Sequence, residues 1–239
     1  MSITNSLHAS FDAEPARRSW ALGLFLIAEG ALALAPLAIL GPAIGWPASL
    51  DTPAAQQLAA IHAAPGALQA GYGLYLLYSL LIAPLMILLA ARQFGGLHRP
   101  IAATVAALGV LSALARAIGI LRWLTVMPEL ATAHASAEPA QRAVIEQVFA
   151  ATTSYGGGVG ELLGVSLLMA LSLGLYAAAS LVLRRGPTWL NALGLGTALL
   201  LAGLALPAFG GPGLVPVAAA VSVLSVWMWA AGVRALWRG

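Results

Sequence analysis

The sequence predicts an all-α integral membrane protein in which six helices form one bundle, and three observations support this. Only 8% of the 239 residues are charged, and 61% are hydrophobic. The apolar residues gather in stretches of roughly 20, the length that an α-helix needs to cross a bilayer. The chain has no lysine, and most of its arginines lie between these stretches. Because soluble helices are shorter and carry a polar face, this pattern excludes a soluble domain.

The apolar stretches predict one transmembrane domain over residues 1–239. The first stretch is too long for the hydrophobic region of a cleaved signal peptide, so it counts as a membrane helix. Tryptophans near the ends of the spans fit the aromatic belts of the two interfaces, with Trp20, Trp189 and Trp237 on one side and Trp46 and Trp123 on the other. The predicted helices cover residues 20–40, 70–91, 101–124, 158–183, 189–208 and 214–236.

The arginines predict the orientation of the spans. Eight arginines flank the same ends of the predicted helices, whereas only Arg142 lies in a segment on the opposite side. Basic residues accumulate on the cytoplasmic side of membrane proteins, so both termini are predicted to be cytoplasmic, in a bacterial inner membrane. The eight arginines are Arg17, Arg18, Arg92, Arg99, Arg184, Arg185, Arg234 and Arg238.

Two segments on the predicted outer side are long enough to hold helices. Asp51-Thr52-Pro53 has the pattern of a helix cap followed by a first-turn proline, and predicts a short helix to about Ala64, where Pro65-Gly66 ends it. Residues 136–154 predict an amphipathic helix before the fourth span, either a cover on the bundle or a gate over an outward cavity. Its apolar face consists of Val144, Ile145, Val148 and Phe149.

Several chemistries are excluded by residue types that the chain lacks. Without lysine there is no retinal Schiff base, and without cysteine there are no iron–sulfur ligands, thiolate zinc sites or disulfides. We therefore predict no cofactor and no metal site. No nucleophile, base and metal ligands converge in the spans, so no enzyme is predicted, and the net charge of +3 reflects sidedness, not nucleic-acid binding. The histidines fall in tails or loops, at His8, His62, His98 and His134.

Apart from Arg234, at the cytoplasmic end of the last span, four charged residues lie inside the predicted spans. A charge near the bilayer centre costs about 2.5 to 3.5 kcal/mol on insertion scales, so these side chains are expected to face the bundle interior and pair. Their order of depth predicts a ladder of alternating charge through the outer half of the bundle, from Glu29 to Arg116, Glu161 and Arg122. With Tyr75 of the second span, these four are the predicted ligand-binding residues.

Small residues at four-residue spacing predict close contact between the third and fourth spans near these charges. A glycine-rich run at residues 155–158 is also predicted to interrupt the helix before Glu161 and to leave backbone N–H groups that face either a ligand or simply a loop. The small residues are Gly109, Ala113 and Ala117 in the third span and Gly156, Gly160 and Gly164 in the fourth.

Residues 116–164 also carry a resemblance. The Arg122-Trp123 pair and the Gly160-Glu161-Leu162-Leu163-Gly164 motif resemble a family of bacterial six-helix membrane proteins known only as a domain of unknown function. The resemblance implies a multi-pass membrane protein and supplies no activity. Its members often carry histidine where this chain has Leu162, so it implies no metal site or proton relay here.

Three function classes stay open on the sequence, and the third, an intramembrane enzyme acting on lipid, is disfavoured because no catalytic groups converge in the spans. The first is a small transporter or solute-binding membrane protein, in which the Glu/Arg cluster holds a small polar solute and opens to the outside. The second is a non-catalytic sensor or assembly partner of another protein, in which the charges only fix helix register. A polar cavity that reaches Glu29 would favour the first.

Overall fold

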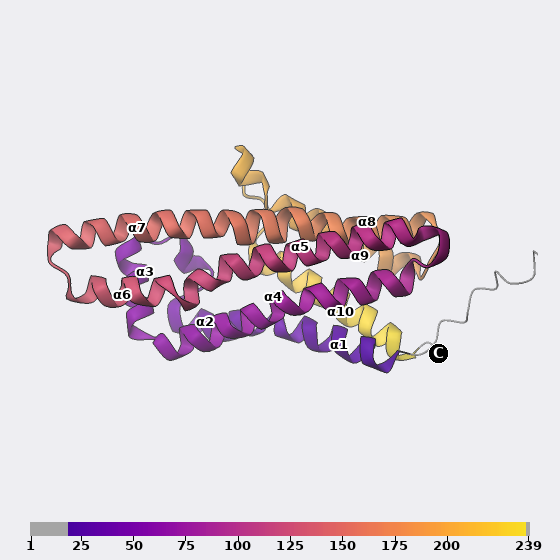
Figure 1. Cartoon of the computed structure of the whole chain (residues 1–239), viewed down its shortest axis with the longest axis horizontal. Coiled ribbons are helices and arrows are strands. Elements are labelled where there is room, and N and C mark those ends of the chain that lie inside the picture. The colour runs from indigo at the N-terminus through magenta and orange to yellow at the C-terminus, as the bar shows by residue number, and fades with distance from the viewer. Residues whose placement is uncertain (1–18, 238–239) are drawn as a thin grey trace, which may run out of the picture.

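A computed structural model describes residues 19–237, and in that range the regular structure is entirely helical (Figure 1). Arg17, Arg18 and Arg238 lie outside the described residues. Long helices run side by side along one axis (Figure 1). The elements are α1 (Trp20–Leu32), α2 (Ala35–Ile44), η1 (Ala48–Asp51), α3 (Ala54–Ala63), α4 (Pro65–Gln93), η2 (Gly96–His98), α5 (Arg99–Leu124), α6 (Val126–Ser136), α7 (Pro139–Gly157), the π-helical η3 (Gly158–Met169), α8 (Ala170–Val182), α9 (Thr188–Gly203), η4 (Leu206–Phe209) and α10 (Val217–Trp237).

Five helical segments of the described chain are long and apolar enough to cross a membrane, as expected of a multi-pass membrane protein. The fifth predicted span is the exception, because α9 has only 16 residues. At 1.5 Å per residue it reaches about 24 Å, less than the hydrocarbon thickness of about 30 Å. The prediction of 189–208 is too long because Pro207 lacks a backbone N–H and restricts the residue before it. The five segments are Trp20–Ile44, Pro65–Gln93, Gly96–Ser136, Pro139–Val182 and Val217–Trp237.

Prolines also explain why helix boundaries in the N-terminal half of the chain differ from the predicted ones. The first span breaks after Leu32, since Pro36 cannot donate a hydrogen bond to the preceding turn, and it resumes as α2. The short helix predicted up to about Ala64 is confirmed as α3. The helix ends before Pro65 as predicted, because the residue before a proline is pushed out of helical geometry, and Ala64 has a φ of −130° and a ψ of 50°. The same proline also begins the next helix. It occupies the first turn of α4, where its missing N–H costs nothing, so the second span begins five residues earlier than predicted.

The predicted break at residues 155–158 is wrong. The helix continues through the glycines from α7 into η3 and α8, so that residues 139–182 form one rod of 44 residues. The glycines provide close approach instead of flexibility, because a Cβ atom at Gly156 would overlap the Arg122 side chain. The amphipathic helix predicted on the outer surface is the start of this rod, and it pairs with α6 in a hairpin that projects along the bundle axis (Figure 1).

Only part of the predicted apolar face of the hairpin is buried. Phe149 is buried, whereas Val144 and Val148 are exposed. Phe149 packs with Leu58 of α3 and Trp123 in a smaller core formed by α2, α3, α6, α7 and the adjoining turns of α4 and α5. The expected cover is therefore a separate packed layer at one end of the molecule, and not a helix lying flat on the bundle.

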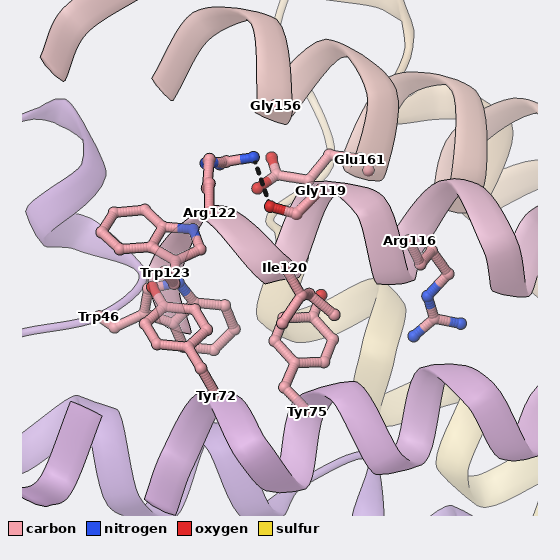
Figure 2. A pocket seen from close by; sticks show the side chains of 11 residues that line it. Trp46, Tyr72, Tyr75, Arg116, Gly119, Ile120, Arg122, Trp123, Gly156 and Glu161 are labelled. Atoms are coloured by element: carbon pink, nitrogen blue, oxygen red, sulfur yellow. Dashed lines mark hydrogen bonds between the residues drawn. The ribbon is translucent and has the colours of Figure 1, made fainter. Parts of the chain in front are cut away.

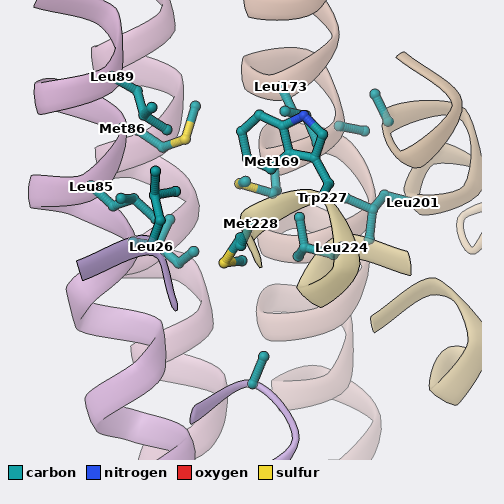
Figure 3. Packing of buried hydrophobic residues seen from close by; sticks show 14 of the residues in the cluster. Leu26, Leu85, Met86, Leu89, Met169, Leu173, Leu201, Leu224, Trp227 and Met228 are labelled. Carbon is teal, nitrogen blue, oxygen red and sulfur yellow. The ribbon is translucent and has the colours of Figure 1, made fainter. Parts of the chain in front are cut away.

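A second and larger core fills the rest of the bundle. Figure 3 shows Met86 of α4, Met169 of η3 and Met228 of α10 projecting into this core, where Trp227 lies beside Met169 and Leu26 of α1 belongs to the same cluster. These side chains are buried. Each fully buried apolar side chain contributes about 1.5 to 3 kcal/mol where water is the alternative, but inside a bilayer the gain comes mainly from close packing.

The glycine motif of the fourth span forms the contact that it predicts. A Cβ atom added to Gly119 of α5 would lie 2.6 Å from the Gly160 Cα, so the two backbones touch. Beside them the Ser112 hydroxyl donates to the Gly164 carbonyl at 2.7 Å. Gly109, in contrast, faces α4, where an added Cβ would lie 2.5 Å from the Met86 Cβ.

The described arginines of the predicted inner flanks gather at one end of the bundle, opposite the α6–α7 hairpin (Figure 1). The Gln93 side-chain amide donates to Ser180 Oγ at 2.8 Å and to the Arg185 carbonyl at 3.1 Å, which ties the end of α4 to the α8–α9 turn. The Ser19 N–H donates to the Ala235 carbonyl at 3.3 Å, which brings the start of α1 to the end of α10. The arginines at this end are Arg92, Arg99, Arg184, Arg185 and Arg234.

We expect Gly119→Ala to destabilise the fold by about 1–3 kcal/mol, because the added methyl meets the backbone of Gly160, which cannot rotate away. Gly73→Ala in α4 is the matched control, since no atom lies within 4 Å of an added Cβ there. Alanine's helix propensity should make the control neutral or stabilising by up to about 1 kcal/mol. Melting temperatures of the purified variants measure the difference, and equal effects would contradict the backbone contact.

Candidate functional site

A cavity of about 500 Å³ lies between η3 and the region where α9 gives way to α10. This volume falls within the 300–1,000 Å³ typical of small-molecule sites. Its polar end is formed by Arg116 of α5, Tyr75 and Tyr78 of α4, and Glu161 of η3. Three of the five residues predicted from the sequence, Tyr75, Arg116 and Glu161, therefore line one cavity.

Arg116 borders the cavity although only 3% of its surface is exposed. Figure 2 shows its side chain pointing from α5 toward α4. There the guanidinium carbon lies 4.4 Å from the centre of the Tyr78 ring, a cation–π contact that is stronger in a dry site than in water. Gly164 leaves room for the arginine stem, because a Cβ atom there would lie 2.7 Å from Arg116 Cγ. The Nε of Arg116 has no hydrogen-bond partner.

Glu161 and Tyr75 complete the polar end. Glu161 is exposed even though it lies in the middle of a long helix, since the cavity opens in front of it. Its backbone carbonyl accepts a hydrogen bond from the Ser166 hydroxyl at 3.0 Å, five residues on, along the wide turn of η3. Tyr75 is half-buried and meets the ring of Trp46 edge to face at 5.9 Å. The cavity thus presents a cation, an anion and a phenol to whatever it holds.

Arg122 lies in a recess next to the main cavity, with room for about one water in its 20 Å³. The guanidinium turns toward Gly156, away from α4 (Figure 2), and donates through Nη1 to the Gly119 carbonyl at 2.9 Å. The recess and the cavity share Trp46, Tyr75, Arg116 and Glu161, so Arg122 belongs to the same polar region. Arg122 and Glu161 also attract each other electrostatically.

Glu29 does not join the site. Its side chain is fully buried, neither carboxyl oxygen has a hydrogen-bond partner, and it lines neither the cavity nor the recess. It shares a face of α1 with Leu22 and Leu26 of the large core. The charge of Arg116 acts on it, but within residues 19–237 no ion pair joins any of the four charges of the predicted ladder. The predicted ladder of direct pairs is wrong, because aromatic and backbone groups take the places expected for the acids.

Sequence reasoning missed part of the site. Trp46 and Trp123 were expected as interface anchors, yet Trp46 borders the cavity and Trp123 is buried against the Tyr72 ring, 4.8 Å between centres. Tyr72, Tyr75 and Tyr78 are spaced so that they share one face of α4. This spacing could have predicted that the aromatic side chains cluster there. In contrast, Trp20, Trp189 and Trp237 are exposed near the arginine-rich end, as interface anchors are.

The rest of the cavity wall carries no signal in the sequence. It consists of ordinary apolar side chains of η3, α9, the η4 segment and α10, which look like any other lipid-facing or core residues. No group of three or more potential metal ligands gathers within residues 19–237. Outside the site, two potential metal ligands approach each other in the α6–α7 hairpin. There His134 Nε2 lies 2.9 Å from Glu146 Oε1.

We expect Arg116→Leu to destabilise the fold, by about 3–5 kcal/mol, because it removes the cation that acts on the buried Glu29 carboxyl. Adding Glu29→Leu should recover much of the loss, since both buried polar groups are then replaced by apolar ones. Thermal unfolding of the single and double variants measures this. Arg142→Leu, at an exposed arginine, serves as the control and should change stability by less than about 0.5 kcal/mol. Equal damage in single and double variants would refute the coupling.

Comparison with known proteins adds a family and no activity. No curated protein and no solved structure matches the chain. A family model described as "Domain of unknown function (DUF4386)" matches residues 21–233, which include both motifs noted in the sequence and every residue of the cavity. The match spans nearly the whole described bundle, and the chain belongs to this family of unknown function.

Proposed function

We propose that this chain binds a small molecule in the cavity between η3 and α10, at a site that opens to the outer side of the membrane, as a small transporter or solute-binding membrane protein. The observation that carries this proposal is the cavity of about 500 Å³ whose polar end combines the buried Arg116 with the exposed Glu161. Ionisable residues inside a membrane protein are costly, so their presence at the wall of a cavity favours a role in binding.

The proposed solute is polar and carries a carboxylate, an amine or both. Arg116 offers donors to a carboxylate, Glu161 accepts from an amine, and the Tyr75 hydroxyl can hydrogen-bond to either. Glu29 is not part of this proposal, because its carboxyl group is sealed in the core. A ligand between Arg116 and Glu29, as the sequence suggested, would have to displace the packing around α1.

The proposed topology has six spans with both termini in the cytoplasm of a bacterium. It is supported by the collection of the inner-flank arginines at one end of the bundle and by the exposed tryptophans there. The α6–α7 hairpin at the other end would then project outside, because residues 139–182 are about twice as long as a bilayer requires. The cavity, near the boundary of α7 and η3, would face the outer side.

Cysteine labelling in intact cells tests this topology, and the chain has no cysteine of its own to interfere. Ser136→Cys and Phe209→Cys, both at exposed positions, should react with a membrane-impermeant thiol reagent from outside. Ser6→Cys and Leu97→Cys should react only after the cells are opened; Leu97 is chosen because Gly96 next to it has a φ of +59°. Labelling of Leu97→Cys from outside would overturn the orientation, and protection of Phe209→Cys would show that α9 does not cross the membrane.

Access to the cavity tests the binding function. Gly158→Cys places a thiol on the cavity wall, where an added Cβ meets no atom within 4 Å, whereas Leu163→Cys places one on an exposed face of the same helix that does not line the cavity. An impermeant charged reagent should modify the first from outside and spare the second. Binding predicts that at least one compound in a panel of small carboxylates, amines and amino acids slows this modification. Arg116→Gln and Glu161→Gln should each abolish the protection.

A different outcome would favour the second function. If Gly158→Cys is not reached from outside, the cavity is closed and the solute-binding proposal fails. The α6–α7 hairpin would then be the better candidate, as a contact for a partner protein. It projects from the bundle and exposes apolar side chains, among them Val144, Val148 and Tyr155.

A further inference from the structure

We infer that the ligand of this cavity is a single-chain amphiphile, with a zwitterionic head group between Arg116 and Glu161 and an apolar tail against α9 and α10. This inference rests on the proposed function, because it names the class of molecule that the same cavity would bind. It goes further in assigning a role to the apolar wall, which a small polar solute leaves without a partner.

The cavity is divided by chemistry. Its polar groups come from α4, α5 and η3, while the opposite wall is apolar. A small zwitterion held at Arg116 and Glu161 would leave most of the 500 Å³ to water in contact with hydrocarbon side chains, which is unfavourable. A tail that covers this wall removes that contact. The wall consists of Leu201, Leu204, Val215, Val217, Val221 and Leu224.

The mouth of the cavity allows such a molecule to enter from the side. It is bordered by exposed residues of two elements, Ser154 and Gly158 on the rod and Pro207 and Ala208 on the connection after α9. That connection also exposes Phe209, with 73% of its surface accessible, and other large apolar side chains nearby. Exposed apolar side chains at the edge of a bilayer lie against lipid, so the mouth borders both the lipid and the outer solution.

The head group is defined by the two charges that face the cavity. Arg116 is nine-tenths or more buried and has an Nε without a hydrogen-bond partner, so it requires an acceptor. Glu161 is exposed to the cavity and makes no ion pair in the described chain. A head group with both signs of charge can satisfy the two residues together, whereas an anion alone would meet Glu161 and a cation alone would meet Arg116.

The test uses dodecylphosphocholine, which joins a zwitterionic head to a single apolar chain, and the protein in nanodiscs of phosphatidylglycerol. Two comparison probes separate its parts: phosphocholine has the same head without the tail, and dodecyl maltoside has the same tail with an uncharged head. The readout is the rate at which the impermeant reagent modifies Gly158→Cys. We expect dodecylphosphocholine to protect this thiol at concentrations at least tenfold below those of either comparison probe.

Two neighbouring leucines provide matched variants in the same background. Leu162→Trp fills the cavity, whereas Leu163→Trp adds the same bulk on the lipid-facing side, where 44% of Leu163 is exposed. Leu162→Trp should raise the concentration of dodecylphosphocholine needed for protection at least tenfold, and Leu163→Trp should leave it unchanged. Melting temperatures of both variants without probe show that each is folded.

Each outcome bears on one of the two proposals. If phosphocholine protects as well as dodecylphosphocholine, the solute site stands and the amphiphile is refuted; if dodecyl maltoside protects equally, the charged head is refuted. If all three probes fail while a compound of the soluble panel protects, only the amphiphile fails, and if both sets fail, both proposals do. Nanodiscs of phosphatidylcholine show whether the ligand comes from the bilayer or from solution. Protection of the Gly158→Cys thiol before any probe is added would identify a bilayer lipid as the occupant. Lack of protection without probe would identify a free single-chain molecule.

Discussion

The backbone contact between α5 and η3 is the constraint on which the site depends. Gly119 and Gly160 bring the two helices so close that neither can carry a side chain there, and the adjacent Gly156 and Gly164 leave the space that Arg122 and Arg116 occupy. Without that space the arginine stems would have to leave the interface. The four small residues therefore do more than allow packing, because they set the direction of two charged side chains from one helix, one toward α4 and one toward α7 (Figure 2).

The two arginines are stabilised by groups that carry no formal charge. Arg116 lies over the ring of Tyr78 and Arg122 donates to a backbone carbonyl. Such contacts return only part of the cost of desolvating a guanidinium. Direct pairing with Glu29 or Glu161 would return more, and its absence leaves Glu161 facing the cavity and Arg116 with a donor unused. A polar region that is incompletely satisfied within the protein is what a binding site for a charged ligand requires.

The sequence predicted the spans well where hydrophobicity and length decide them. The third span, predicted at 101–124, is α5 within two residues, and the contact of its neighbour through Gly160 follows from four-residue spacing. The prediction of helix boundaries failed where one residue type can have two structural roles. Pro65 both ended α3 and began α4, and Gly156 served close packing inside a helix instead of breaking it. The approach of a distant helix, which decides between these roles of a glycine, is not visible in a local pattern.

The same limit applies to the site. Tyr75, Arg116, Arg122 and Glu161 could be proposed because ionisable and hydroxyl groups are rare in membrane spans. Glu29 has the same rarity and still lies outside the site, since depth along a helix does not specify the face that it presents. The apolar wall could not be proposed at all. A leucine that lines a cavity and one that faces lipid, such as Leu162 and Leu163, are identical until the neighbouring helices are in place.

The short α9 and the cavity have a common cause. Between Gly203 and Val217 the chain contains three prolines and three glycines, and Gly210 adopts a φ of +79°, so no α-helix continues through this connection, which holds only the short 3₁₀ turn η4. α9 therefore ends at Gly203, and α10 packs mainly on α1 and α9. The first turns of α10 line the cavity together with η3, and Arg116 and Glu161 line the same cavity. Had α9 continued to the full length predicted for the fifth span, its side chains would have filled that space, so the prolines and glycines that shorten this helix also leave room for a ligand.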